Sequence, residues 1–236
     1  MRNIKFAKDN FYHLYNRGVE KRNIFLDDND RWRFLQGLFL FNDIKSSTNI
    51  LWQVERLFGR ATFKTIKTFL KKQKREPLVR LMADCLMPNH YHLLVEEIND
   101  GGISRFMHKL GTGYTMYFNK KHRRVGSLFQ GPYKVVAVAD LGQLERLLAY
   151  INVINPGQLV EPRLKEKGIK SPKKIMSFAK DYLWGTHQEY LGKRESIIID
   201  KGILGDVFSD PNDYRKFIAT TLEEKKFEDI DDIILE

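Results

Sequence analysis

The stretch from 87 to 96, MPNHYHLLVE, constrains the fold of this chain more than any other. Pro88 and Asn89 are typical turn residues, and the aromatic, aliphatic and β-branched residues that follow predict a strand beginning near His90. Because side chains alternate between the faces of a strand, His90 and His92 should project from the same face. Two imidazoles at this spacing can bind one divalent cation, but an isolated pair is also typical of ordinary half-buried strand histidines.

Three other segments have the composition of strands. Residues 78–87 should pair with the histidine strand as a hairpin through the Pro88-Asn89 turn. Residues 11–18 predict an earlier strand and residues 135–138 a later one. His13 in the early strand could approach the histidine pair, although a histidine in an aromatic strand more often has a structural role.

Apolar residues at helical spacing predict four helices among these strands. They are, in order, a helix capped by Asp27 or Asp28, a cationic amphipathic helix from Phe58 to Arg75, a long helix from Ile103 to Phe118, and a helix that is capped by Asp140 and ends at Asn155-Pro156-Gly157.

The chain divides into a larger and a smaller part. Residues 1–160 contain all the predicted strands, and residues 161–236 form a basic linker at Lys165 to Lys174 followed by a smaller, mostly helical region rich in aromatic residues. The polar stretch Ser46–Asn49 should interrupt the helices of the larger part. The last residues, from Glu223, are acidic and should fray.

Composition indicates a polyanionic partner. The 236 residues carry a formal net charge of +10, and such a surplus favours binding to nucleic acid or an acidic membrane. A single cysteine, Cys85, excludes an internal disulfide and suits a reducing compartment. Without a secretory leader or an apolar run long enough to cross a bilayer, we expect an intracellular, cytoplasmic protein with no membrane partner.

Four short motifs occur in an order that resembles a known family. They are Tyr15-Asn16-Arg17-Gly18, Met87-Pro88-Asn89-His90-Tyr91-His92-Leu93-Leu94, Leu128-Phe129-Gln130-Gly131-Pro132-Tyr133-Lys134, and Ala149-Tyr150-Ile151-Asn152 with Asn155-Pro156. This set is similar to the single-tyrosine HUH transposases of small insertion sequences, and most similar to the REP-associated tyrosine transposases. The resemblance spans roughly the first two thirds of the chain.

The resemblance implies an α+β fold, a mainly antiparallel sheet with flanking helices in a ferredoxin-like or RRM-like core. It implies a homodimer that acts on single-stranded or hairpin DNA in DNA transposition. His90 and His92 would bind Mg²⁺ or Mn²⁺, and Tyr150 would attack a DNA phosphate to form a 5′-phosphotyrosine. Tyr150 should lie at the edge of the buried stripe of the last helix.

The third metal ligand is where the chain departs from the family pattern. Relatives often carry an amide side chain four residues after the tyrosine, but that position is Ile154 here. The nearest amides are Asn152, which should point away from Tyr150 on a regular helix, and Asn155. Because Asn155 precedes a proline, we expect it to be non-helical and to bend back toward the metal.

Basic residues should contact the DNA. The expected contacts are Arg17, Lys71, Lys72, Lys74, Lys120, Lys121, Arg123, Arg124 and Lys134. His108 and His122 have no partner at ligand spacing, so we expect them to be surface residues.

Two other functions remain open on the sequence alone. The chain could keep the fold without the chemistry and bind DNA or RNA hairpins by stacking and charge. It could instead be an unrelated hydrolase whose histidine pair activates water through a metal ion. An intact tyrosine beside the two histidines favours the transposase.

Overall fold

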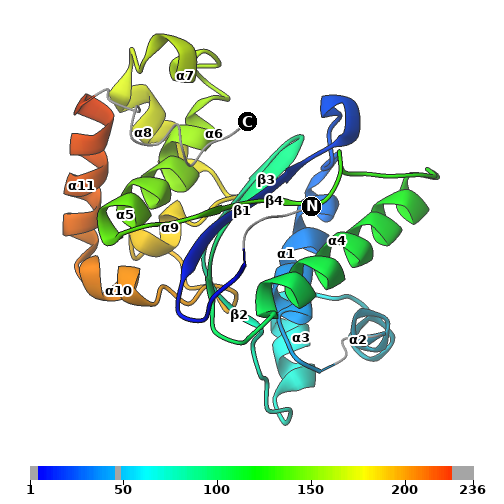
Figure 1. Cartoon of the computed structure of the whole chain (residues 1–236). Helices are drawn as coiled ribbons and strands as arrows, with labels where there is room; N and C mark the ends of the chain where they lie inside the picture. The colour runs from blue at the N-terminus through cyan, green and yellow to red at the C-terminus, as the bar shows by residue number, and fades with distance from the viewer. Residues whose placement is uncertain (1–4, 46–48, 225–236) are drawn as a thin grey trace.

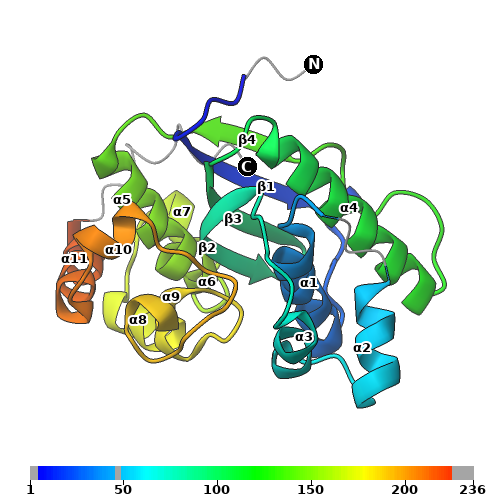
Figure 2. The same ribbon diagram turned by 90° about the horizontal axis from the view of Figure 1, so that it is seen from below.

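A four-stranded antiparallel sheet divides the molecule into two helical layers (Figures 1 and 2). The computed structural model describes residues 5–45 and 49–224. The strands are β1 (Phe11–Arg17), β2 (Val79–Met87), β3 (His90–Glu97) and β4 (Lys134–Ala137), in the spatial order β2-β3-β1-β4. The four predicted strands are confirmed, with boundaries that differ from the predicted ones by no more than one residue.

The chain visits the strands in the order of a ferredoxin-like core. A helix follows β1, β2 and β3 form a hairpin, a second helix follows, and β4 returns beside β1. In the register of the sheet, His90 lies opposite both Arg17 and Met87, and Tyr15 lies opposite Lys134. The end of β1 and the starts of β3 and β4 therefore meet at one end of the sheet.

One face of the sheet is covered by the first helical layer (Figure 1). Its helical segments are η1 (Val19–Lys21), α1 (Asp28–Phe41), α2 (Ile50–Phe58), α3 (Phe63–Leu70) and α4 (Gly102–Lys121). Tyr91 and Leu93 of β3 point into this layer and share one buried core with Phe34 of α1 and Tyr114 of α4. Asp27 caps α1 by accepting a hydrogen bond from the Asp30 N–H, as the sequence predicts.

The predicted cationic helix from 58 to 75 is wrong in extent. Gly59 adopts φ 77°, a left-handed conformation that ends α2, and Thr62 then caps α3 by accepting from the Thr65 N–H while the Thr65 hydroxyl accepts from the Thr62 N–H. Helix α3 ends at Leu70, so Lys71, Lys72 and Lys74 lie beyond it. The helical spacing of apolar residues across 58–75 predicted one helix, but the Gly59 stop signal and the Thr62 cap divide the segment.

The second helical layer covers the histidine face of the sheet (Figure 2). Its segments are α5 (Leu141–Ala149), η2 (Tyr150–Ile154), α6 (Asn155–Gly157), α7 (Leu164–Lys167), α8 (Pro172–Asp181), α9 (His187–Tyr190), α10 (Ile203–Val207) and α11 (Pro211–Glu224). Asp140 caps α5, as predicted. Leu94 of β3, Leu148 of α5 and Ile218 of α11 belong to one hydrophobic cluster, so the C-terminal helices share a core with the sheet.

The expected division at residue 160 stays a prediction, although the C-terminal region is mostly helical, as expected. The expected interruption at Ser46–Asn49 falls largely on residues 46–48, and the acidic end largely on residues 225–236, which lie outside the described residues. Within the described ranges, no helix has both the length and the apolar character needed to cross a bilayer.

Candidate functional site

His90 and His92 project from the same face of β3, as the alternation predicts. His90 is half-buried at the start of the strand, and His92 is 0% exposed beneath the second helical layer. Their ring centroids are 5.0 Å apart with the planes at 89°. Tyr91 between them is buried in the opposite core, against Phe34. The strand thus presents two imidazoles to one layer and an aromatic ring to the other.

His13 of β1 belongs to the same group. Its Nε2 lies 2.8 Å from His92 Nδ1 in a buried hydrogen bond, and the two rings stack with centroids 5.0 Å apart. When His92 donates from Nδ1, its own lone pair is on Nε2, the nitrogen that a metal ion would use. The contact orients His92 through a second imidazole, which is the role that outer partners play for histidine ligands.

Tyr150 lies directly over this group of histidines. Its ring meets the His92 ring edge-on at 5.4 Å and the His13 ring at 6.2 Å. Tyr150 was expected at the edge of the helix stripe, and that is wrong because its side chain is 0% exposed. The second helical layer encloses the phenol, since helices α6 and α8 pack against the turn that carries it.

A π-helical turn brings Asn155 to the face of Tyr150. The Asn155 N–H bonds to the Tyr150 carbonyl five residues back, and the turn η2 contains that extra residue. Asn155 has φ −63° and ψ −53°, so the expectation that it is non-helical is wrong. Ile154 stands four residues after Tyr150, where relatives often carry an amide. Because the π-helical turn is one residue wider, Asn155 reaches the side of the helix that faces His90 instead.

The polar atoms between His90 and Asn155 suit a cation. His90 Nε2 and Asn155 Oδ1 lie 3.4 Å apart. Asn89 Oδ1 is 2.6 Å from His90 Nδ1, and its amide is oriented by a bond from Nδ2 to the Lys21 carbonyl. A neutral His90 therefore donates from Nδ1 and carries its lone pair on Nε2.

Asn155 also presents an acceptor to this gap. Gln158 Nε2 donates to Asn155 Oδ1 at 2.9 Å and to the Asn155 carbonyl at 3.3 Å, which fixes which end of each amide is oxygen. His90 Nε2 and Asn155 Oδ1 are both atoms of a type that can coordinate a cation, and they lie close together. Among the described residues, no group of three or more His, Cys, Asp or Glu side chains could hold a metal ion, so the candidate set depends on the amide.

Asn152 points away from this group, as predicted. Its Nδ2 donates to the Tyr214 hydroxyl at 3.0 Å and its Oδ1 accepts from Thr186 at 2.7 Å, both deep in the second layer. The structure therefore separates the two amides near Tyr150: one faces His90 and the other joins the C-terminal helices to η2.

Lys165 is a site residue that the sequence reasoning missed. Its Nζ donates to the Tyr150 hydroxyl at 2.7 Å and lies 4.9 Å from the centre of the Tyr150 ring. The residue sits in α7, within the segment predicted to be a linker. No local signal marks it, because fifteen residues separate it from Tyr150 and only the packing of α7 brings them together.

A cavity of about 330 Å³ opens beside His90 at the end of the sheet. Arg17, His90 and Lys134 line it together with Tyr15 and Gln130. Lys134 Nζ lies 5.6 Å from the centre of the Tyr15 ring, and Arg17 is within 3.5 Å of the Gln130 side chain. Two of the predicted DNA contacts, Arg17 and Lys134, thus lie next to the histidine pair.

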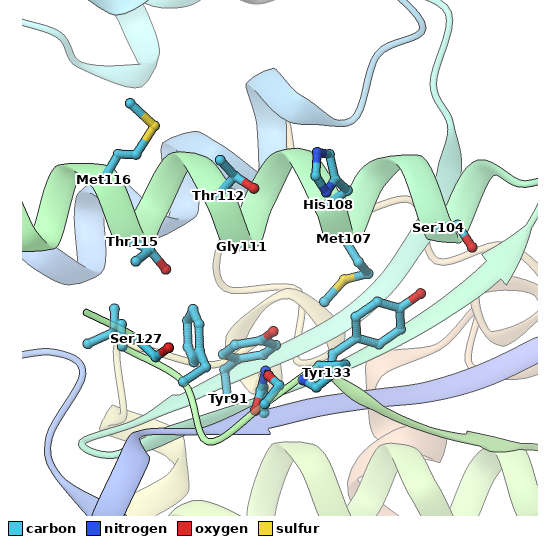
Figure 3. A pocket seen from close by; sticks show the side chains of 15 residues that line it. Tyr91, Ser104, Met107, His108, Gly111, Thr112, Thr115, Met116, Ser127 and Tyr133 are labelled. Atoms are coloured by element: carbon cyan, nitrogen blue, oxygen red, sulfur yellow. The ribbon is translucent and has the colours of Figure 1, made fainter. Parts of the chain in front are cut away.

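A larger cavity of about 540 Å³ lies on the other side of the Gly131-Pro132 segment. Figure 3 shows Met107 and Thr115 projecting from α4 toward Tyr91, Ser127 and Tyr133. Apart from Asn16, His108 and two glycines, its lining residues are apolar, aromatic or hydroxyl-bearing. The predicted lysine and arginine contacts are not among them.

The other predicted basic contacts lie away from the histidines. Lys71, Lys72 and Lys74 are exposed on the segment leading to β2, whose first residue pairs with Glu97 at the opposite end of the sheet from His90. Lys120, Arg123 and Arg124 follow or end α4 in the first helical layer. Lys121 forms ion pairs within the protein, with its Nζ 2.7 Å from both Asp27 and Asp30.

The two remaining histidine predictions have different outcomes. His108 is exposed on α4, as expected. His122 is not a plain surface residue, because its Nε2 lies 3.0 Å from Asp30 Oδ2 and only 18% of its side chain is exposed. The error arose because its partner comes from α1, ninety-two residues earlier.

Other tyrosines near the sheet have structural surroundings. The Tyr114 hydroxyl donates to the Ile24 carbonyl at 2.5 Å, and burial raises the pKa of its phenol far above the ordinary value. The Tyr117 hydroxyl contacts Asp30, and burial raises its pKa as well. Both lie in the first helical layer, on the far side of the sheet from His90 and His92.

Comparison with known proteins finds a family that the central part of the chain resembles. Residues 51–153 match the family model described as "Transposase IS200 like". The matched range contains His90, His92 and Tyr150 and stops two residues before Asn155. No curated protein matches the chain.

Two solved structures are similar at low identity. A REP-associated tyrosine transposase bound to a REP hairpin matches with 13% identity and a TM-score of 0.47, over 85% of this chain and 93% of that one. The tRNA(His) guanylyltransferase from Saccharomyces cerevisiae matches with 10% identity and a TM-score of 0.31, over 78% of this chain and 76% of that one.

The family match covers the hairpin that carries both histidines and the helix that leads to Tyr150, which are the elements that form the site. Over residues 51–153, the chain is therefore similar to the IS200-like transposases.

Proposed function

We propose that this protein cleaves and rejoins single-stranded or hairpin DNA through a metal-assisted 5′-phosphotyrosine intermediate. Tyr150 is the nucleophile, and His90, His92 and Asn155 are the ligands of Mg²⁺ or Mn²⁺. The observation that carries the proposal is the meeting of these groups on one face of the sheet: the Tyr150 ring is 5.4 Å from that of His92, and Asn155 Oδ1 is 3.4 Å from His90 Nε2.

The reaction exchanges one phosphodiester for another. The Tyr150 oxygen attacks the phosphorus in line, a bond from that oxygen to phosphorus forms, and the bond from phosphorus to the 3′ oxygen breaks. The phenol loses its proton and the leaving oxygen gains one, so the products are a 5′-phosphotyrosyl strand and a strand ending in a 3′-hydroxyl. Because the ester keeps the bond energy, a 3′-hydroxyl can reverse the step without a nucleotide cofactor.

The donor atoms fit a divalent cation. Two imidazole nitrogens and one amide oxygen leave coordination positions for water and phosphate oxygens, as a catalytic rather than structural site requires. When bound, the ion would polarise the phosphate and stabilise the charge that gathers on its oxygens. Asn89 and His13 hold His90 and His92 in the orientation that such binding needs.

Arg17 and Lys134 are the proposed contacts to the DNA backbone beside the cleaved phosphate. Both line the cavity next to His90. Tyr15, which also lines this cavity, is buried with only 5% of its surface exposed, so it supports the cavity wall rather than stacking on a base. The exposed lysines beyond α3 and the basic end of α4 are proposed as more distant contacts. The expected homodimer remains a prediction in its own right.

A covalent trapping assay tests the function. The full chain would be incubated with a pool of hairpin oligonucleotides with randomised stems and flanks, labelled at the 3′ end, in Mn²⁺, Mg²⁺ or EDTA. We expect a label that stays with the protein in denaturing gels when either metal is present, and not in EDTA.

Other outcomes would identify the competing functions. Release of the label on a free 5′-phosphate strand, without a covalent species and with Tyr150→Phe as active as wild type, would indicate a hydrolase. Hairpin binding without any cleavage would indicate a binding protein on the same fold.

A further inference from the structure

The Tyr150 hydroxyl is held by a lysine from a different part of the chain. Lys165 Nζ donates to the Tyr150 oxygen at 2.7 Å and at the same time lies 4.9 Å from the ring centre. A charged donor at this distance makes a stronger hydrogen bond than a neutral one. The contact therefore holds the phenol oxygen itself, the atom that would attack phosphorus.

The position of Lys165 is set by its neighbours rather than by its own charge. Leu164 and Ile169 on either side of it are 0% and 2% exposed and belong to the core that contains Tyr150. Gly157, at the end of the helix that carries Tyr150, lies so close to Leu164 and Ile175 that an added Cβ would stand 2.8 Å from Ile175. The segment carrying Lys165 is thus packed tightly against the helix carrying Tyr150.

The phenol is consequently held from two sides. The rings of His13 and His92 meet the Tyr150 ring edge-on from the sheet, and the Lys165 ammonium holds the oxygen from the helical layer. A nucleophile must be aimed at phosphorus, and a misplacement of about 1 Å can cost about 100-fold in rate.

We propose that Lys165 is a positioning residue of the cleavage site, which holds the Tyr150 hydroxyl in the orientation needed for attack on the DNA phosphate. This inference rests on the proposed function and adds a residue beyond the family match, which ends at residue 153. Once the ester forms, the same ammonium stands beside the phosphoryl oxygens attached to Tyr150.

Lys167 provides a matched control on the same short helix. It carries the same charge two residues away and is exposed. A general electrostatic contribution of α7 to DNA binding would affect Lys165→Met and Lys167→Met alike. A positioning role requires that only the first variant loses rate.

The experiment measures single-turnover adduct formation at saturating hairpin DNA, together with the Kd for the same DNA. Lys165→Met should lower the rate about 100-fold with the Kd within about twofold of wild type, and Lys167→Met should change neither. Treating Lys165→Cys with 2-bromoethylamine places an amine at nearly the same position. The treated variant should form the adduct at least about tenfold faster than the untreated one. Wild type treated in the same way is the control, since its single cysteine, Cys85, is buried.

Three results would overturn the inference. Lys165→Met could cleave within about twofold of wild type, its loss could appear entirely in the Kd, or the aminoethylated cysteine variant could stay as slow as the untreated one. In each case an active wild type shows that the proposed function stands and only the role of Lys165 fails. If wild type forms no adduct, the proposed function fails and this role fails with it.

Discussion

Two buried polar clusters lie on opposite sides of the same sheet, and they differ in how their polar atoms are satisfied. In the first helical layer, Asp30 accepts hydrogen bonds from the Leu26 N–H at 2.9 Å, Lys121 at 2.7 Å and His122 at 3.0 Å. On the histidine face, the described partners are imidazoles, amides and one ammonium. The first cluster is therefore centred on a carboxylate surrounded by donors, whereas the histidine face gathers imidazole and amide groups of the kind that can bind a cation.

The pKa of Asp30 illustrates the completed case. Burial alone would raise it, but hydrogen bonds from Lys121, from the Leu26 N–H and from His122 outweigh burial and lower it below the ordinary value. The comparison teaches that a buried histidine or tyrosine is not by itself a sign of function. Tyr117 and His122 both contact Asp30 in a structural network, and the tyrosine and histidines that we assign to catalysis meet on the other side.

The largest expected effect is on cleavage, when the histidines of the second cluster are removed. His90→Ala and His92→Ala should each abolish cleavage, with losses above the 10- to 100-fold typical of outer partners, because each removes a proposed ligand. Hairpin binding and folding should largely persist. Cleavage rates in Mg²⁺ and Mn²⁺ check this, with the exposed His108→Ala as the matched control. Normal cleavage by either ligand variant would refute the metal site.

Removal of the carboxylate should affect stability and spare the chemistry. Asp30→Asn should lower the free energy of unfolding by about 2–3 kcal/mol at neutral pH, since charged hydrogen bonds to Lys121 and His122 are lost. The folded pKa of Asp30 is lower than the unfolded one, so its contribution is fully present above the unfolded value near 3.8 and is lost as pH falls through the folded value.

Urea unfolding of Asp30→Asn and wild type between pH 3 and pH 7 measures this difference. The gap between the two proteins should be widest at pH 7 and close in acid. A variant that folds normally but no longer cleaves would mean that the first cluster has a catalytic role that we do not assign to it.

The smallest expected effect is on DNA binding, where basic residues close to His90 should contribute more than those at the other end of the sheet. Arg17→Gln with Lys134→Gln should weaken hairpin binding and reduce the magnitude of the salt slope by about 1–2, because both side chains line the cavity beside His90. Neutralising Lys71, Lys72 and Lys74 together should change the slope less, since they lie toward the other end of the sheet. Fluorescence anisotropy across a salt series checks both, and equal slopes would erase the distinction.

Local rules were sufficient to predict most of the fold. Turn chemistry at Pro88-Asn89, the alternation through β3 and the cap at Asp140 each act within a few residues, so the sequence reveals them directly. The boundary error at 58–75 could have been avoided, because Gly59 and Thr62 are ordinary stop and start signals.

The candidate site was harder to predict than the fold, because its contacts depend on a local helix irregularity and on long-range packing. We predict Asn155 as a ligand because it should leave the helix before Pro156, but its backbone is helical. It reaches His90 because the π-helical turn adds one residue between it and Tyr150. The spacing of apolar residues gives no sign of such a turn. Lys165 reaches Tyr150 only through the packing of Leu164 and Ile169, and a long-range contact of this kind leaves no pattern in the surrounding sequence.

The most direct test of the account is to locate the covalent bond. Adduct formed on labelled hairpin DNA would be digested with trypsin and mapped by mass spectrometry, with Tyr150→Phe as the parallel sample. We predict DNA attached through a 5′-phosphate to the peptide that contains Tyr150, and no adduct from the variant despite unchanged hairpin and metal binding. Attachment to a peptide containing Tyr114, Tyr117 or Tyr133 would contradict the assignment, as would an undiminished adduct from Tyr150→Phe.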